Sequence, residues 1–144
     1  MSKEIPAYVA GHQLLAGKHI LITAAAGAGI GFSAAKRAVE EGAATLVISD
    51  IHQGRLEQAV ETLAALDSQC SVHGIVADVT NEQQVQHLVD EAERLSGGID
   101  VLINNAGLGG TCTLADMQDE AWNRVIDISL TGTMRMMRAM VRYM

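Results

Sequence analysis

A turn made only of alanine and glycine separates a short apolar run, residues 19–23, from a helical pattern that begins at Ile30. The N-terminus of a helix carries unpaired N–H groups and roughly half a unit of positive charge, so it can hold a pyrophosphate without lysine or arginine. We therefore predict a pyrophosphate site at Gly27, Ala28, Gly29, Ile30 and Gly31. Phe32 stands where the G-x-G-x-x-G fingerprint has its third glycine, and a merely tight strand-to-helix connection is the alternative.

A carboxylate, Asp50, closes the next apolar run, residues 44–49, and follows Gly31 by 19 residues. An acidic side chain about 20 residues past the glycines, at the end of the second strand, is where the ribose of NAD is bound. Its oxygens can accept hydrogen bonds from the 2′- and 3′-hydroxyls, and its charge repels a 2′-phosphate. Since no arginine stands at 51 or 52, we expect NAD(H). The alternative is that Asp50 caps the following helix, with Gln53 three residues on.

Four apolar runs, at residues 19–23, 44–49, 72–77 and 99–103, alternate with helical patterns. Glycines are expected to end the first helix at Gly42 and the third at Gly97. Thr80-Asn81-Glu82-Gln83 resembles a capping box at the start of the third helix. The last helix is expected to start near Asp116, with an amphipathic, Met-rich segment from Trp122 to Met144.

This alternation predicts an α/β fold, a Rossmann-type doubly wound parallel sheet with helices on both faces. Right-handed crossovers give the strand order 3-2-1-4 and place a cofactor crevice between strands one and four. The carboxyl ends of parallel strands meet at one edge, so Asp50, Asp78 and Asn104–Gly107 are expected there together. Strand four would be an open edge in this stretch, so we expect the sheet to be incomplete here.

Composition narrows the function classes. With 49% hydrophobic and 19% charged residues, the 144-residue chain is expected to fold as one domain after an irregular lead-in, residues 1–17. The net charge of −7 argues against nucleic acid or an anionic membrane as partner. Two distant cysteines and five isolated histidines lack metal-ligand spacing, so no metal site is predicted. We expect no membrane span, no signal peptide and a cytoplasmic location.

The turn Thr23–Gly31, Asp50, Asp78-Val79 and Asn104-Asn105-Ala106-Gly107 together resemble the classical short-chain dehydrogenase/reductases, from about residue 14 to the end. The resemblance implies that Asp78 and Val79 contact the adenine, and that Asn105, Ala106 and Gly107 line the crevice between adenosine and nicotinamide. An Asp can accept from the adenine amino group, and Ala106-Gly107 leaves room for a flat ring. The alternatives are that Asp78 is a turn or cap residue and that the asparagines pin neighbouring loops.

Three departures from the family pattern affect the chemistry. Ala24 follows Thr23 where the family has glycine, and one extra residue precedes Gly29. Ser129 stands where the family has an asparagine that anchors a water of the proton relay, so Ser129 is either a catalytic hydroxyl or a small packing residue. The sequence has no Tyr-x-x-x-Lys, the pair that handles the substrate proton in this family. This stretch alone is therefore expected to be inactive.

The resemblance implies an NAD(H)-dependent oxidoreductase that moves hydride between nicotinamide and a secondary alcohol or ketone. Residues 18–144 would form its dinucleotide-binding portion, and the catalytic Tyr and Lys are expected beyond residue 144. The alternative is a non-catalytic dinucleotide-binding or oligomerisation module. Family members are mostly dimers or tetramers packed through the last helix, so a homodimer or homotetramer is expected, with a small-molecule alcohol or ketone as substrate.

Overall fold

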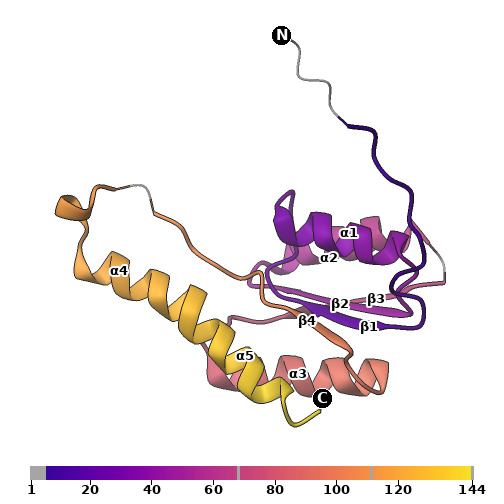
Figure 1. The fold of residues 1–144 in the computed structure, drawn as a ribbon. Coiled ribbons are helices and arrows are strands. Elements are labelled where there is room, and N and C mark those ends of the chain that lie inside the picture. The colour runs from indigo at the N-terminus through magenta and orange to yellow at the C-terminus, as the bar shows by residue number, and fades with distance from the viewer. Residues whose placement is uncertain (1–5, 68, 111, 144) are drawn as a thin grey trace.

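Four strands form a single parallel sheet in the computed structural model, which describes residues 6–67, 69–110 and 112–143. They are β1 (His19–Ile22), β2 (Thr45–Asp50), β3 (Ser71–Val76) and β4 (Val101–Ile103), in the order β3-β2-β1-β4 (Figure 1). The predicted fold class and strand order are confirmed. β4 is shorter than the predicted run and lies at one edge of the sheet.

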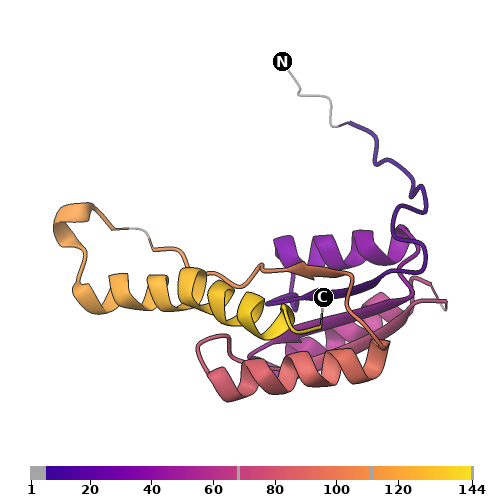
Figure 2. The same ribbon diagram turned by 60° about the horizontal axis from the view of Figure 1, so that its bottom comes forward.

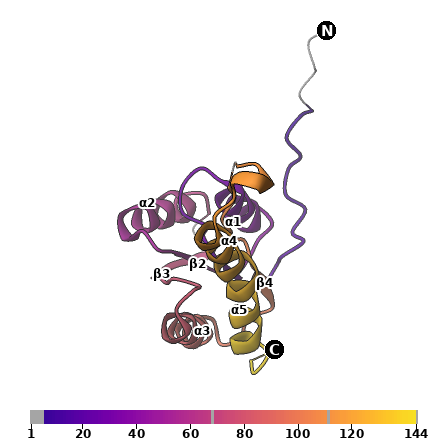
Figure 3. The ribbon, with the colours of Figure 1, turned by 90° about the vertical axis from the view of Figure 1, so that its left-hand side faces the viewer.

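Two helices cover each face of the sheet. α1 (Ile30–Glu40) and α2 (Gln53–Ala64) pack on one face, and α3 (Glu82–Ser96) and α5 (Gly132–Met140) pack on the other (Figures 2 and 3). Successive strand side chains point to opposite faces. Ile20 and Ile22 therefore pack with α1 and α2, whereas Leu21 packs with α3 and α5. The central strands β1 and β2 are almost wholly buried between the two helix layers, whereas the edge strand β3 is only partly buried and includes His73 and Gly74.

The helix ends agree with the glycine pattern but not with the predicted capping box. Gly42, after the first helix, has a φ of +81°, and Gly97 ends α3 with a φ of +72°. The N-cap of α3 is Asn81, whose side-chain oxygen accepts from the N–H groups of Gln83 and Gln84. Thr80 is not the cap, because its hydroxyl donates to Asp78 at 2.7 Å.

The predicted last helix begins three residues later than expected, at Asp119, and it contains a π-helical turn that the sequence did not predict. A 3₁₀ turn spans Leu114–Asp116, and α4 spans Asp119–Ile126. A π-helical turn, Asp127–Thr131, then joins α4 to α5, and α5 ends at Met140. α4 extends away from the sheet, whereas α5 lies against α3 (Figure 1). Met144 lies outside the described residues.

The lead-in is tied to α1. Residues 1–5 lie outside the described part, and residues 6–18 have no helix or strand. Arg37 of α1 donates to the carbonyl of Val9 at 2.6 Å. The buried carboxylate of Glu41 accepts from the N–H groups of His12 and Leu14 at 2.7 and 3.1 Å. Among the described residues, no helix has the length and apolar character that crossing a membrane requires.

Candidate cofactor site

Loops at the carboxyl ends of all four strands line one open cavity of about 420 Å³. Ala24 follows β1, Asp50 ends β2, Asp78–Thr80 follow β3 and Ala106–Leu108 follow β4. Parallel strands end at the same edge of a sheet, so residues far apart in sequence meet there. The structure thus brings together five predicted site residues, Asp50, Asp78, Val79, Ala106 and Gly107.

The glycine turn lies beside this cavity and contributes Ala24 to its lining. Gly27 and Ala28 line a second cavity, on the outer side of α1 with Tyr8 and Phe32. Gly29 is the N-cap of α1, with extended backbone, and Ile30 is the first residue of the helix and is exposed. Within the described part of the chain, the N–H groups of residues 27–29 donate no hydrogen bond, so they remain available to an anion at the helix N-terminus.

The turn has two conformational requirements. Ala24 has a φ of +52°, the left-handed region that favours glycine, and it stands where the family pattern has glycine. The stretch before Gly29 is one residue longer than in the family pattern, and within it Gly27 has a φ of +102°, which only glycine readily adopts. The turn keeps its place between β1 and α1 although its spacing departs from the family pattern.

Asn105 joins the turn to the loop after β4. Its side-chain amide donates to the carbonyl oxygens of Thr23 and Ala24, at 3.1 and 2.9 Å. In return, the Thr23 hydroxyl accepts from the N–H groups of Asn105 and Ala106, both at 3.0 Å. A Cβ on Gly31 would overlap the Asn105 amide and would lie 2.7 Å from the Ala24 carbonyl oxygen. Asn105 thus pins two loops, the alternative role considered for it, and Gly31 allows the close approach.

Asp50 presents one carboxylate oxygen to the protein and leaves the other unused by it. Its Oδ1 accepts from the N–H of His52 at 3.0 Å and lies 3.5 Å from Nη2 of Arg55. No hydrogen bond from the described residues reaches Oδ2. The helix cap is His52 rather than Asp50, so the capping alternative for Asp50 is not what the structure shows. A carboxylate that is 8% exposed and keeps an oxygen for a hydroxyl fits a ribose.

Asp78 and Val79 are held in place by different contacts. Oδ1 of Asp78 accepts from the N–H and the hydroxyl of Thr80, at 2.8 and 2.7 Å, which is the turn role considered for this residue. Val79 is buried, and a Cβ on Gly132 would lie 2.7 Å from its Cγ2. The backbone of α5 therefore packs directly against the loop that the adenine is expected to contact.

Ser129 lies in the π-helical turn and binds the loop after β4. Its hydroxyl accepts from the N–H of Leu108 at 3.1 Å and lies 3.4 Å from the Leu108 carbonyl oxygen, to which it can donate. A Cβ on Gly107 would lie 3.6 Å from the same hydroxyl oxygen, so the contact is close. π-Helical turns often occur at functional sites, and this one faces the cavity through Asp127 and Ile128.

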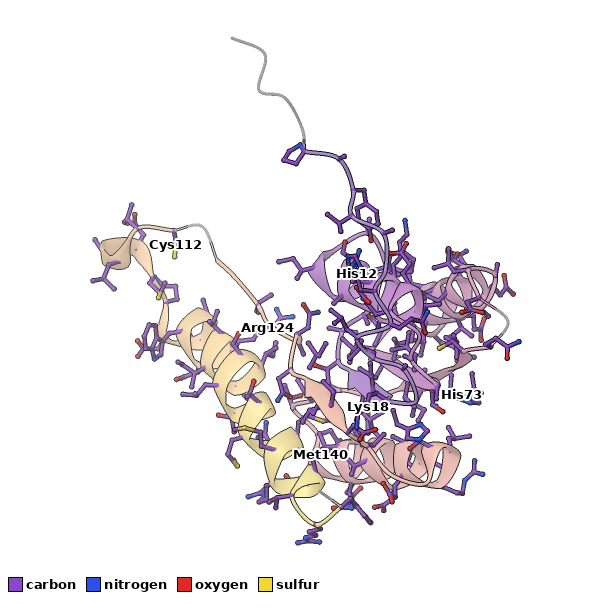
Figure 4. The ribbon with its side chains drawn as sticks, turned by 45° about the vertical axis from the view of Figure 1, so that its right-hand side comes forward. His12, Lys18, His73, Cys112, Arg124 and Met140 are labelled. Atoms are coloured by element: carbon purple, nitrogen blue, oxygen red, sulfur yellow. The ribbon has the colours of Figure 1, made fainter. Side chains whose placement is uncertain are left out.

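Two cavity cations were not predicted from the sequence. Arg55 lies in the first turn of α2, and Arg124 lies on the side of α4 that faces the strand ends (Figure 4). Arg124, Asp127 and Ile128 are spaced i, i+3, i+4, so helical periodicity could have placed them on one face. Asp127 is paired with Arg135 at 2.9 Å. Nothing local in the sequence indicates that Arg55 folds back toward Asp50.

The described cavity lining contains no tyrosine or lysine. Tyr8 hydrogen-bonds Glu40 near the lead-in. Tyr143 donates to Asp90 of α3 at 2.8 Å, and this hydrogen bond raises the pKa of Tyr143. No described group of three or more His, Cys, Asp or Glu residues could hold a metal ion. The lining offers a free carboxylate oxygen on Asp50 and small side chains after β4, and among the described lining residues there is no Tyr–Lys pair to handle the proton of an alcohol or ketone.

The family model for short chain dehydrogenase matches residues 18–144. A Mycobacterium tuberculosis protein, (5R,7aS)-5-hydroxy-7a-methyl-1-oxo-2,3,5,6,7,7a-hexahydro-1H-indene-carboxyl-CoA reductase, is 49% identical over 138 residues, which are 96% of this chain and 52% of that protein. The 3beta-hydroxysteroid dehydrogenase 2 of Eggerthella lenta is 34% identical, and the match covers 90% of this chain and 49% of the Eggerthella protein. The chain spans about half the length of these relatives.

Solved structures agree with the sequence relatives. A short chain dehydrogenase from Mycobacterium smegmatis superposes with a TM-score of 0.92 at 47% identity, covering 97% of this chain and 57% of that one. An NAD⁺-bound xylitol dehydrogenase superposes with a TM-score of 0.84 at 33% identity, covering 91% and 49%. The family resemblance inferred from the motifs is confirmed.

Proposed function

Since the chain belongs to the short-chain dehydrogenase family, we propose that it binds NAD(H) as the dinucleotide-binding portion of an oxidoreductase acting on a secondary alcohol or ketone. The observation that carries the proposal is the placement of Asp50, whose nearly buried carboxylate lines one cavity with the loops after β1, β3 and β4. The family uses a nicotinamide cofactor, and Asp50 favours the form without a 2′-phosphate.

Each part of the cavity has a role in holding the cofactor. Oδ2 of Asp50 would accept from a ribose hydroxyl, and the unpaired N–H groups of residues 27–29 would bind the pyrophosphate. Asp78 and Val79 would flank the adenine, and the small side chains of Ala106 and Gly107 would leave room for the nicotinamide half. When bound, the nicotinamide accepts or supplies the hydride.

Asn105 and Ser129 act by positioning loops in this proposal. The side-chain amide of Asn105 donates to the glycine turn, so this residue fixes the relative position of the two loops that border the crevice. Ser129 uses its hydroxyl on both backbone groups of Leu108, so it orients the loop that leads from the crevice toward the substrate. A role of Ser129 in holding a relay water would require that hydroxyl to leave Leu108.

The proton-transfer residues would belong to the remainder of the enzyme. The relatives are about twice as long as this chain, and the family's Tyr and Lys have no counterpart in the described cavity lining. We place these residues after residue 144 in the parent protein, with residues 18–144 as the cofactor-binding portion.

A ring alcohol or ketone is the substrate class that we favour. The names of two relatives specify a fused-ring acyl-CoA and a hydroxysteroid. In this chain, Cβ atoms built on Gly109 and Gly110 would meet nothing within 4 Å, so the loop after Leu108 leaves open space for a bulky apolar substrate.

An exposed apolar stripe supports a homodimer or homotetramer. Leu130, Met134, Met137 and Val141 recur at helical spacing and are between 40% and 71% exposed. This spacing places them on one face of the helix that runs through the π-helical turn into α5. The same stripe would suit the second candidate function, a non-catalytic oligomerisation module that binds a dinucleotide.

Titration calorimetry with NADH and NADPH tests the proposal. We expect NADH to bind more tightly than NADPH. Asp50→Ala should weaken the binding of NADH by about tenfold or more, since a hydrogen bond to a charged group is worth about 1.5–3 kcal/mol. Asp119→Asn, an exposed carboxylate on α4, is the matched control and should leave both affinities unchanged. Tighter binding of NADPH by the unmodified protein would contradict the cofactor assignment. Retained NADH binding without reductase activity of the full-length enzyme would favour the second candidate.

A further inference from the structure

We propose that Arg55 limits the preference for NADH over NADPH, because it offsets the negative charge of Asp50 at the cavity rim. The inference rests on the proposed function of this cavity as the dinucleotide site. It names a specificity-determining side chain that belongs to neither the glycine turn nor the strand ends.

Arg55 and Asp50 form an ion pair across the start of α2. Nη2 of Arg55 lies 3.5 Å from Oδ1 of Asp50, and both residues line the cavity. The Asp50 side chain is 8% exposed and the Arg55 side chain is 55% exposed. The guanidinium therefore lies on the solvent side of the carboxylate, where a group attached to a bound ribose would meet it.

The two oxygens of Asp50 are used differently. Oδ1 faces the His52 N–H and Arg55, whereas Oδ2 receives no donor from the described residues. A ribose hydroxyl can therefore be accepted by Oδ2 whether or not Arg55 is present. Arg55 is thus not needed for binding the cofactor that lacks a 2′-phosphate.

A 2′-phosphate would experience both charges. The carboxylate alone repels the phosphate, but a guanidinium stays charged at every relevant pH and has several N–H donors in a planar fork that suits phosphate. Its contact with Asp50 is long and uses only one of these donors. The remaining donors can turn toward a phosphate, so the pair repels NADPH less than Asp50 would by itself.

No other described residue of the cavity lining offsets the negative charge of Asp50 in the same way. Asp78 and Asp127 add negative charge, and Asp127 is already paired with Arg135. Arg124, the other cavity cation, belongs to α4, and no ion pair joins it to Asp50 in the described residues (Figure 4). Arg55 is the cation that forms an ion pair with Asp50 in the described residues, so it should govern the ratio of the two affinities.

The test measures dissociation constants of NADH and NADPH for the unmodified protein, Arg55→Gln and Arg55→Lys by titration calorimetry. Both cofactors share the pyrophosphate, so their ratio isolates the 2′-phosphate. Arg55→Gln should raise the dissociation constant of NADPH by about tenfold and that of NADH by less than about twofold. This difference is expected for the loss of a partly screened unit charge at short range. Arg55→Lys keeps the charge and should keep most of the original ratio.

Arg94→Gln is the matched control, because Arg94 forms an exposed ion pair with Glu91 on α3, outside the cavity lining. This variant should leave the ratio unchanged. If Arg55→Gln leaves the ratio unchanged, or weakens both cofactors equally, the inference is overturned while NAD(H) binding stands. If the unmodified protein binds neither cofactor, the proposed function and the inference both fail.

Discussion

The side-chain amide of Asn105 ties the glycine turn to the loop after β4, and it occupies the space in which a Cβ of residue 31 would lie, so Gly31 is what allows this contact. The amide donates to the carbonyls of Thr23 and Ala24, which lie 82 and 81 residues away in the sequence. The glycine turn and the loop after β4 are thus parts of one hydrogen-bonded unit.

Gly31→Ala should destabilise the fold. The added Cβ meets the Asn105 amide and the backbone of Ala24 and Ala25, so the turn must shift. We expect the free energy of unfolding to fall by about 2–4 kcal/mol, measured by chemical denaturation. Gly29→Ala is the control, since its Cβ would meet nothing within 4 Å; an equal loss in that variant would contradict the packing argument.

Thr23→Val should leave the half-buried N–H of Ala106 without its acceptor, and the N–H of Asn105 with only the Ile103 carbonyl at 3.1 Å. The Thr23 side chain is almost fully buried, and its hydroxyl accepts from the N–H groups of Asn105 and Ala106. We expect a loss of about 1–3 kcal/mol in the free energy of unfolding. Thr23→Ser keeps the hydroxyl and should retain more stability than Thr23→Val. The reverse order would show that the γ-methyl group matters more than the hydrogen bonds.

Protonation of Glu41 should release the lead-in at low pH. Hydrogen bonds from the N–H groups of Leu14 and His12, together with Arg37, lower the pKa of Glu41 to about 2 from its ordinary value near 4.5. A lowered pKa contributes stability that is present above the ordinary value and is lost as the pH falls toward 2. The melting temperature should therefore fall over this window, and Glu41→Gln should show a weaker pH dependence.

Glu120→Gln is the control for this measurement, because it removes an exposed carboxylate on α4 and should leave the pH dependence nearly as in the unmodified protein. Identical pH profiles for Glu41→Gln and the unmodified protein would contradict the assigned role of Glu41.

Ser129→Ala should free the loop after β4. Its hydroxyl contacts both backbone groups of Leu108, so the variant should lose about 0.5–1.5 kcal/mol of stability and faster exchange is expected at the Leu108 amide. Hydrogen exchange followed by NMR measures this directly. Thr62→Ala is the control: the Thr62 hydroxyl donates to the Gln58 carbonyl of its own helix, so this variant should leave the exchange rate of the Leu108 amide unchanged. Unchanged exchange in Ser129→Ala would show that the serine only packs.

The sequence by itself determined the layers of this protein and the edge of the sheet at which the loops of the candidate site meet. The apolar runs predict the strands, and helical periodicity predicts the helices that pack on the two faces of the sheet. Right-handed crossovers then leave one strand order. The positions of Asp50, Asp78 and Ala106-Gly107 follow, because residues after parallel strands share one edge of the sheet. These features depend on local pattern and on the chirality of the chain.

Only the tertiary structure decided which side chains meet at that edge. Asn105 uses its amide on the turn, Arg55 approaches Asp50, and Asn81 rather than Thr80 caps α3. The π-helical turn places Ser129 on Leu108 and joins α4 to α5. Such pairings depend on loop backbone angles and on contacts between segments distant in sequence, which residue types and spacing do not specify.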